Sequence, residues 1–308
     1  MPETSVTAGP APAWSRTRWF GLVRALRVQQ WVKNLLLVVP TVLDHRLTDP
    51  PTLLRAGLAF GAFCCAASGA YVLNDLLDIE ADRRHQSKRH RPFASGLVPP
   101  AAGWVLAPAL IGTAALVALL LESPPFAGLL ALYVVSTTAY SVYLKRIAVL
   151  DVLVLAGLYT LRVLAGVAAT GVKFSTWLLA FSMFLFLSLA FLKRYAELTS
   201  FEAGERELLS RRGYQRGDRE WLGALGGASG YLSVLVLALY INSEQVVVLY
   251  RSPLLLWLVC PLLLFWISRL WLLAYRGEID EDPIVATVRD PASYAVGVLV
   301  ALVLYAAL

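Results

Sequence analysis

The residues with the clearest chemical potential lie together between positions 74 and 82. Asn74, Asp75, Asp78 and Asp82 follow a long apolar segment, and on a helix the three aspartates share one face. Carboxylates at this spacing repel one another unless a cation lies between them. Their oxygens suit Mg²⁺, which takes one or two carboxylates together with water and substrate phosphates. The alternative interpretation is a solvated acidic helix end that the following basic run balances.

Basic residues accompany this acidic group in short polar clusters along the chain. If the metal binds a diphosphate, Lys and Arg side chains nearby can bind the oxygens that the metal does not neutralise. Alternatively, Trp31 is an ordinary interfacial anchor, Lys33 extends its amine to the membrane surface, and Lys145 simply marks membrane topology. The cationic residues and their polar neighbours that we assign to substrate binding are Gln30, Lys33, Asn34, Tyr71, Lys88, Arg91, Lys145, Lys193 and Arg194.

A third group of polar residues is harder to explain by topology, because it enters an apolar segment. An ionised side chain within a membrane span costs roughly 2.5–3.5 kcal/mol on insertion scales and therefore suggests a site. Asp151 and Arg162 are eleven residues apart, close to three helical turns, so both can face the same interior. Tyr159 lies on the same stretch. We add Asp151 to the catalytic residues, and Tyr159 and Arg162 to the substrate-binding residues.

Composition assigns these clusters to a membrane protein. The chain is 58% hydrophobic and 16% charged, and its mean hydropathy is +0.65. Apolar runs long enough to cross a bilayer predict an all-α polytopic protein with nine transmembrane helices. We expect a flexible tail at 1–20 and one transmembrane catalytic domain at 21–308. The nine predicted spans are 22–43, 52–76, 101–121, 125–144, 150–170, 176–192, 221–241, 253–273 and 291–308.

The distribution of basic residues predicts the orientation. With a cytoplasmic N-terminus, 22 of the 27 Lys and Arg residues fall in cytoplasmic segments and 4 on the opposite side. This orientation makes the acidic segment cytoplasmic and the C-terminus external. The net charge of +6 therefore reflects topology and anionic lipid, and gives no support for a nucleic-acid partner. A second acidic group at 278–282 could ligate metal, although a capped surface loop explains it better.

The order of these motifs resembles the UbiA superfamily of intramembrane prenyltransferases, over about residues 22–300. Within that superfamily they are most similar to the decaprenyl-phosphate phosphoribosyltransferase branch. The resemblance implies a UbiA-type bundle with its active site facing the cytoplasm. The matching segments are Gln30-Trp31-Val32-Lys33-Asn34, Tyr71-x-x-Asn74-Asp75-x-x-Asp78-x-Glu80-Ala81-Asp82, Lys88-Arg89-x-Arg91-Pro92, Lys145 with Asp151, Arg162-x-x-Ala165-Gly166 and Lys193-Arg194-Tyr195-Ala196-Glu197-Leu198.

One position departs from the superfamily pattern. The second acidic motif is commonly D-x-x-x-D, but Asp151 is followed four residues later by Leu155. A second metal on a prenyl diphosphate would lack one ligand. The resemblance to the phosphoribosyltransferase branch implies that phosphoribosyl pyrophosphate (PRPP) brings the diphosphate instead, and that the lipid carries only a monophosphate.

The implied reaction is Mg²⁺-dependent transfer of 5-phosphoribose from PRPP to a polyprenyl phosphate, which releases pyrophosphate. In this reaction Asn74, Asp75, Asp78 and Asp82 hold Mg²⁺, and Asp75, Asp78 and Asp151 are catalytic. The product would be a lipid-linked pentose precursor for envelope or glycan synthesis, made at the inner membrane of a bacterium. Homo-oligomers are compatible with the sequence.

Two other functions fit the sequence less well. An aromatic prenyltransferase would use a polyprenyl diphosphate, but it would miss the ligand that Leu155 replaces. A transporter of a phosphorylated solute usually places its ionisable groups near the bilayer midplane. Most of the ionisable residues of this chain are expected at one rim of the bundle.

Overall fold

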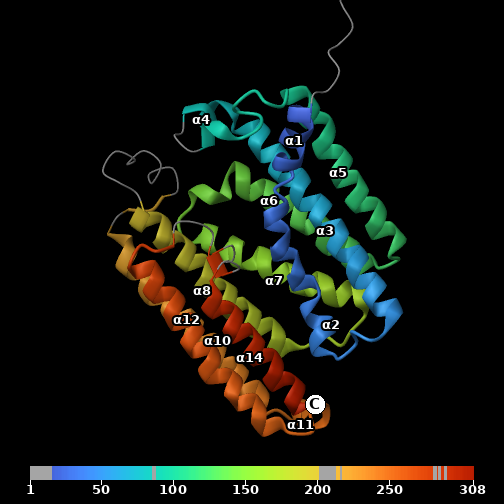
Figure 1. The fold of residues 1–308 in the computed structure, drawn as a ribbon, viewed down its shortest axis with the longest axis vertical. Coiled ribbons are helices and arrows are strands. Elements are labelled where there is room, and N and C mark those ends of the chain that lie inside the picture. Colours follow the sequence, from blue (N-terminus) through green and yellow to red (C-terminus); the bar gives the residue numbers. More distant parts are fainter. Residues whose placement is uncertain are drawn as a thin grey trace, which may run out of the picture. The chain divides into compact units, whose positions relative to one another are not determined.

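The computed structural model describes residues 16–84, 88–200, 213–215, 217–279, 283, 286–287 and 290–308. Every regular element in this part of the chain is helical, which confirms the all-α expectation. The helices form two compact units, which we describe separately (Figure 1). Unit 1 comprises the described residues within 1–28 and 68–111, and unit 2 those within 29–67 and 112–308.

Long α-helices are joined along the chain by short α-helices and 3₁₀ helices. From the N-terminus to the C-terminus, the described helices are α1 (Arg16–Ala25), η1 (Val28–Leu37), α2 (Val39–Leu43), α3 (Pro50–Leu77), α4 (Ile79–Arg84), η2 (Lys88–His90), α5 (Pro100–Leu120), α6 (Pro124–Val142), η3 (Leu144–Arg146), α7 (Leu150–Thr170), α8 (Thr176–Ser200), α10 (Asp218–Ile241), α11 (Glu244–Leu249), η4 (Pro253–Leu258), α12 (Val259–Tyr275) and α14 (Pro291–Ala307).

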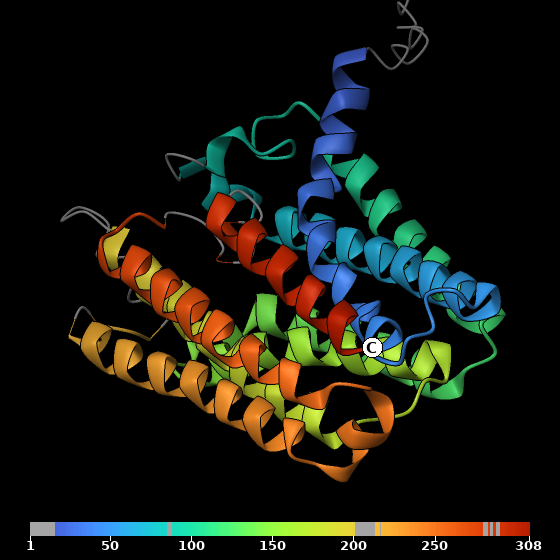
Figure 2. The same cartoon turned by 60° about the horizontal axis from the view of Figure 1, so that its bottom comes forward.

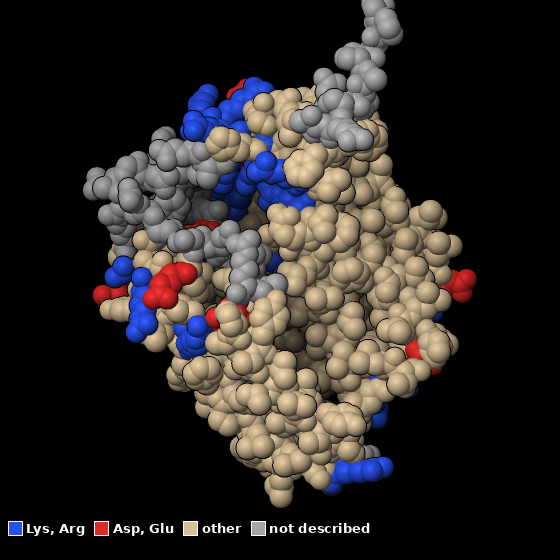
Figure 3. Space-filling model, viewed as in Figure 1, with Lys and Arg blue, Asp and Glu red and all other residues tan. Residues whose placement is uncertain are grey.

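Seven of the nine predicted spans coincide with helices that are long and apolar enough to cross a membrane. These are α3, α5, α6, α7, α8, α10 and the continuous stretch of η4 and α12. Within unit 2, large apolar side chains such as Phe265 and Leu302 are exposed on α12 and α14. Figure 3 shows hardly any charged side chain over the lower half of these two helices. Such a surface is suited to lipid, and the seven helices indicate an integral membrane protein.

The other two predicted spans do not form helices of that length. The segment 22–43 is divided among α1, η1 and α2, because the backbone leaves helical geometry at Arg27, which has a φ of 52°. A new helix, α2, begins at Val39 with Pro40 in its first turn. The helix α14 has 17 residues. A count of nine spans therefore stays a prediction. Residues 16–20 of the predicted tail belong to α1, whereas residues 1–15 and the acidic residues 280–282 lie outside the described residues.

Local sequence signals explain several helix ends in unit 2. The Ser123 side chain caps α6 by accepting a hydrogen bond from the Phe126 amide at 3.4 Å. Gly171 ends α7 in the left-handed region, with a φ of 69°. Asp290 caps α14 and also pairs with Arg269 at 2.9 Å. Burial alone would raise the pKa of Asp290, but hydrogen bonds from Ser293 and the charge of Arg269 lower it below its ordinary value.

The core of unit 1 lies where the end of α3 meets the segment after η2 and the start of α5. Val72, Leu76, Phe93 and Val98 are buried together there. Gly103 permits the close approach of α5, since a Cβ at this position would lie 2.8 Å from the Phe93 ring. Removing these apolar side chains from solvent fixes the end of α3, which carries Asp75.

The core of unit 2 is built around α8, which packs against α7, α10 and α12. Figures 1 and 2 show α10 and α12 side by side along the same edge of the bundle. Gly226 lets the Trp271 indole of α12 reach α10 and α8, because a Cβ there would lie 2.2 Å from the ring. The indole N–H donates to Ser188 on α8 at 3.1 Å, so the polar edge of Trp271 is also satisfied.

A second close approach fixes η1 on α7 within unit 2. A Cβ at Gly166 would lie only 2.1 Å from the carbonyl oxygen of Leu37, so no other residue fits without displacing the backbone. This contact holds η1 against the helix that carries Arg162. It also accounts for the burial of Lys33 and Asn34, two polar residues of η1 that are 7% and 0% exposed.

Candidate functional site

Unit 1 brings two of the three aspartates together around one arginine. Arg91 Nη1 donates to Asp82 Oδ2 at 2.7 Å and to Asp75 Oδ1 at 3.1 Å. Arg27 Nη2 donates to the same Asp75 oxygen at 2.6 Å. Both aspartates are buried, at 2% and 4% exposure. The guanidinium of Arg91 therefore lies between the two carboxylates, and the binding of Mg²⁺ by them stays a prediction.

The third aspartate lies at the break between two helices. α3 ends at Leu77 and α4 begins at Ile79, so Asp78 occupies the turn and is half-buried. Helical hydrogen bonding continues through the break, because the Asp82 amide donates to the Asp78 carbonyl at 2.8 Å. Asn74, Tyr71 and Lys88 are also half-buried in unit 1. The expectation of one face on a single helix is thus corrected, although the helical spacing is kept.

These carboxylates fit a metal that arrives with its substrate. Among the described residues, no group of three or more His, Cys, Asp or Glu side chains could hold a metal ion by itself. A pair of carboxylates is nevertheless enough for Mg²⁺ when water and substrate phosphates complete its shell. Burial raises the pKa of Asp82, and the charge of Arg91 opposes this rise. Burial and the charge of Arg91 therefore act in opposite directions on the Asp82 carboxyl.

The basic residues of α4 and η2 form an exposed cationic surface beside this pair in unit 1. Arg83, Arg84 and Arg89 are all solvent-exposed, and Figure 3 shows basic side chains in blue near the top of the view. Arg27 packs over the Tyr71 ring at 5.0 Å. Sequence analysis missed Arg27 because it was counted only as a topology residue at the start of the first predicted span.

In unit 2, Arg162 is a buried cation whose hydrogen-bond partners are all neutral. Its Nε donates to Asn34 Oδ1 at 2.9 Å, Nη1 to the Leu158 carbonyl at 2.6 Å and Nη2 to the Tyr133 hydroxyl at 2.9 Å. The side chain is 5% exposed. Within the described part of the chain, no carboxylate forms an ion pair with it. The contacts of Arg162 in the described residues are thus with an amide, a carbonyl and a hydroxyl.

A second buried cation approaches the same aromatic surface. Lys33 Nζ lies 5.7 Å from the centre of the Tyr159 ring, and the Arg162 guanidinium lies 5.7 Å from that centre as well. The Tyr133 ring is 4.7 Å from Arg162. Aromatic faces stabilise cations but carry no net charge. Lys33, Asn34, Tyr159 and Arg162, which the sequence assigned to substrate binding, are thus brought together and create a positive region.

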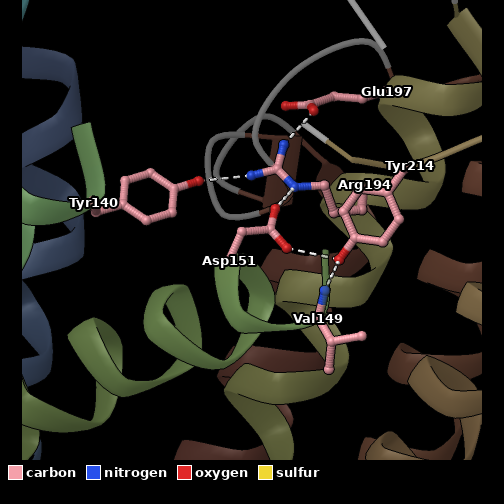
Figure 4. Close-up of polar contacts among 6 residues, drawn as sticks. All are labelled: Tyr140, Val149, Asp151, Arg194, Glu197 and Tyr214. Atoms are coloured by element: carbon pink, nitrogen blue, oxygen red, sulfur yellow. Dashed lines mark hydrogen bonds and ion pairs between the residues drawn. The ribbon is translucent and has the colours of Figure 1, made fainter. Parts of the chain in front are cut away.

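Asp151 and Arg194 form a different network, in which the charges are matched (Figure 4). Arg194 pairs with Asp151 through Nε and with Glu197 through Nη1, and its Nη2 donates to the Tyr140 hydroxyl at 2.7 Å. Asp151 is fully buried and Arg194 is 2% exposed. Protein partners occupy all three nitrogens of this guanidinium. The roles predicted for Asp151 in catalysis and for Arg194 in anion binding therefore stay predictions, and the observed contacts are internal.

The same network holds a strained turn before α7. Val149 has a φ of 68°, which is rare for a β-branched residue, and the Leu150 amide donates to the Ala148 carbonyl at 2.8 Å. The Tyr214 hydroxyl accepts from the Val149 amide at 2.8 Å and donates to Asp151 at 2.6 Å. Burial and the bond to the Asp151 carboxylate raise the pKa of Tyr214. Tyr214 was missed because its surroundings in sequence predict a solvated loop.

Three further residues predicted for substrate binding lie in unit 2, and two tyrosines of unit 2 were not predicted. Gln30, Lys145 and Lys193 are half-buried in unit 2. Tyr133 and Tyr140, which contact the two buried arginines, had no assigned role. Their spacing of seven residues places them on one face of α6, and this periodicity was the available signal.

Comparison with known proteins gives one family. The UbiA prenyltransferase family matches residues 43–288. The chain is 38% identical over 279 residues to the uncharacterized protein y4nM of Sinorhizobium fredii, covering 90% of this chain and 54% of that protein. It therefore spans about half the length of y4nM. It is also 37% identical over 274 residues to the nodulation protein NoeC of Azorhizobium caulinodans, covering 87% of each.

A relative with a named reaction and a solved structure extend the comparison. The decaprenyl-phosphate phosphoribosyltransferase of Mycolicibacterium smegmatis is 37% identical over 202 residues, covering 64% of this chain and 61% of that protein. The structure of a UbiA homolog from Archaeoglobus fulgidus bound to GPP and Mg²⁺ matches with a TM-score of 0.67 at 16% identity. That match covers 92% of this chain and 96% of the other, and it shows the fold.

Proposed function

Because the chain belongs to the UbiA prenyltransferase family, we propose that it is a membrane transferase that moves 5-phosphoribose from PRPP to a polyprenyl phosphate of decaprenyl type. The observation that carries this proposal is Arg162. A buried guanidinium with only neutral partners favours an anionic ligand, and both proposed substrates carry phosphate. The relative from Mycolicibacterium smegmatis supports the choice of reaction.

The chemistry follows from the charge of the substrates. An oxygen of the lipid phosphate attacks the anomeric carbon of PRPP, a C–O bond forms there, and the bond to the diphosphate breaks to release pyrophosphate. The attacking oxygen is already anionic, so no side chain needs to remove a proton. The substitution gives the anomeric carbon oxocarbenium character, as in glycosyl transfer generally.

We assign the diphosphate to unit 1. Asp75 and Asp82, with Asn74 and Asp78 nearby in sequence, would hold Mg²⁺, which supplies positive charge to the departing pyrophosphate. Arg91 and Arg27 already contact these carboxylates and can turn toward phosphate oxygens when a metal replaces them. The Mg²⁺ bound to the solved homolog supports a metal of this kind.

We assign a substrate phosphate to Lys33 and Arg162 in unit 2. Asp151 acts there as a positioning residue, because Arg194 and Tyr214 occupy both of its oxygens. We further propose one catalytic domain over 21–308 in a bacterial inner membrane, with the N-terminus and the active site cytoplasmic, as the distribution of basic residues indicates. The product would then supply a lipid-linked pentose for envelope or glycan synthesis.

A second candidate reaction is prenyl transfer from a polyprenyl diphosphate to an aromatic acceptor. The solved homolog bound to GPP and Mg²⁺ supports it. The position of Leu155 argues against it, because this side chain packs against the apolar core of unit 2 and offers no metal ligand. The family match does not support a transporter of a phosphorylated solute, because the matching family is one of prenyltransferases.

Ligand-dependent unfolding of the purified protein tests the proposed binding. PRPP with Mg²⁺ should raise the unfolding temperature, since a ligand that binds only the folded state stabilises it. Asp75→Asn and Asp82→Asn should fold but lose this shift, because each removes a carboxylate from the pair. Asp44→Asn is the matched control, since Asp44 pairs with Arg46 outside the site. The assignment would be refuted if PRPP raised the unfolding temperature equally with Mg²⁺ and with chelator. It would also be refuted if PRPP raised the unfolding temperature equally in Asp75→Asn, Asp82→Asn and Asp44→Asn.

A further inference from the structure

One face of α6 carries three hydroxyl groups, on Tyr133, Thr137 and Tyr140. They are four and three residues apart, so they are neighbours along the helix. Tyr133 accepts a hydrogen bond from Arg162, and Tyr140 accepts one from Arg194. Thr137 lies between these two contacts. Its Oγ1 is buried and has no hydrogen-bond partner within the described part of the chain.

This unpaired hydroxyl is unusual for a threonine in a helix. Such a side chain normally donates to the carbonyl four residues earlier. Thr138, the next residue, does so with Val134 at 2.8 Å, and Thr160 on α7 does so with Ala156 at 3.1 Å. A buried polar group without a partner is unfavourable, and native proteins rarely retain one without a reason. A ligand from outside the chain would supply the missing partner of Thr137.

We infer that Thr137 is a substrate-binding residue, whose hydroxyl bonds to the oxygen-rich head of a substrate. This inference rests on the proposed function and adds a residue to it. A threonine hydroxyl both donates and accepts, so it suits a phosphate oxygen or a ribose hydroxyl. The neighbouring Tyr133 contacts Arg162, the buried cation without an acidic partner, which favours an anionic group at this position.

Thr137 would also contribute to substrate specificity. A polyprenyl chain has no hydrogen-bond donor or acceptor, so it would leave the hydroxyl unsatisfied, whereas a phosphorylated head would satisfy it. Sites built to bind polar groups reject ligands that lack them, because their own buried polar groups are then left unpaired. The hydroxyl therefore discriminates between the head and the tail of the lipid substrate, and accepts PRPP as well.

Thr137→Val tests the inference, because valine keeps the shape and removes only the hydroxyl. Thr138→Val is the matched control one residue away. We expect Thr137→Val to be at least as stable to heat as the wild type, since an unpaired buried hydroxyl is removed. The KM for PRPP or for polyprenyl phosphate should rise about tenfold, with a smaller change in kcat. Thr138→Val should leave both KM values unchanged.

The two KM values separate the sources of the bonded oxygen. A rise for PRPP alone identifies the sugar phosphate, and a rise for the lipid alone identifies its phosphate head. Unchanged KM values for both substrates would overturn the inference, as would a lower unfolding temperature of Thr137→Val without any effect on KM. If the wild type transfers no phosphoribose, the proposed function fails separately. In that case the role of Thr137 is tested by the rise in unfolding temperature that each substrate causes. Equal rises in the wild type and in Thr137→Val would overturn the role of Thr137.

Discussion

Arg162 and Arg194 are both buried arginines of unit 2, but their surroundings differ in charge. Arg194 pairs with Asp151 and Glu197, so its charge is more than balanced by its acidic partners. Arg162 contacts an amide, a carbonyl and a hydroxyl. Taking one partner from a buried ion pair is strongly destabilising, whereas removing an isolated buried charge is not. We therefore expect Arg194 to contribute mainly to stability and Arg162 to contribute mainly to anion binding.

Replacing each arginine by methionine separates these roles. Arg194→Met should lower the free energy of unfolding by about 3–5 kcal/mol, because Asp151 is left buried without its cation. Arg162→Met should unfold at a temperature near that of the wild type but lose its stabilisation by PRPP and Mg²⁺. Thermal unfolding with and without ligand measures both effects. Equal destabilisation of the two variants, with PRPP binding retained in Arg162→Met, would contradict this division.

At the scale of elements, the position of η1 depends on one glycine of α7. η1 supplies Lys33 and Asn34, and Asn34 accepts the hydrogen bond from Arg162 at 2.9 Å. The backbone of Leu37 passes so close to Gly166 that a methyl group would overlap its carbonyl. The observed packing of η1 on α7 therefore requires that position 166 lack a side chain.

Alanine substitutions on α7 test this contact. Gly166→Ala should cost about 1–3 kcal/mol of stability, as overpacking does, and should weaken PRPP binding because η1 moves away from Arg162. Gly157→Ala on the same helix is the control, since its Cβ would meet no atom within 4 Å. It should be neutral or stabilising, because alanine favours helix over glycine. A functional Gly166→Ala protein of normal stability would show that η1 does not depend on this approach.

Long elements could be predicted from the sequence, and short ones could not. Apolar runs of about 20 residues identify membrane helices such as α7 and α8 directly, because every backbone polar group in lipid must bond within its own helix. The break at Arg27 was missed, since an apolar pattern does not distinguish one long helix from a chain of short ones. The resulting 3₁₀ helix η1 buries its polar residues against α7.

The site was predictable as residue types but not as pairs. Asp75, Asp82, Lys33 and Arg162 were all identified by type and setting. The pairing of Asp151 with Arg194, 43 residues apart, follows from tertiary packing. Nothing in the sequence indicated this pairing, and the roles predicted for Asp151 in catalysis and for Arg194 in anion binding stay predictions. The contacts of Arg27 and Tyr214 also follow from tertiary packing, with Asp75 and Asp151 respectively.

At the scale of the whole molecule, the two candidate reactions differ in which substrate carries the diphosphate leaving group. A prenyl diphosphate brings its leaving group on the lipid, whereas PRPP brings it on the sugar. The carboxylate pair of Asp75 and Asp82 could serve a diphosphate from either source. The lack of a carboxylate at Leu155 and the surplus charge of Arg162 favour PRPP with a lipid monophosphate.

A transfer assay with the purified protein measures this difference most directly. Radiolabelled PRPP, polyprenyl phosphate and Mg²⁺ are supplied in one reaction, and polyprenyl diphosphate with an aromatic acid in another. We predict lipid-linked phosphoribose and pyrophosphate in equal amounts from the first reaction, no product from the second, and loss of activity in Asp75→Asn or with chelator. Transfer of the prenyl chain to the aromatic acid, without any lipid-linked phosphoribose, would contradict the account.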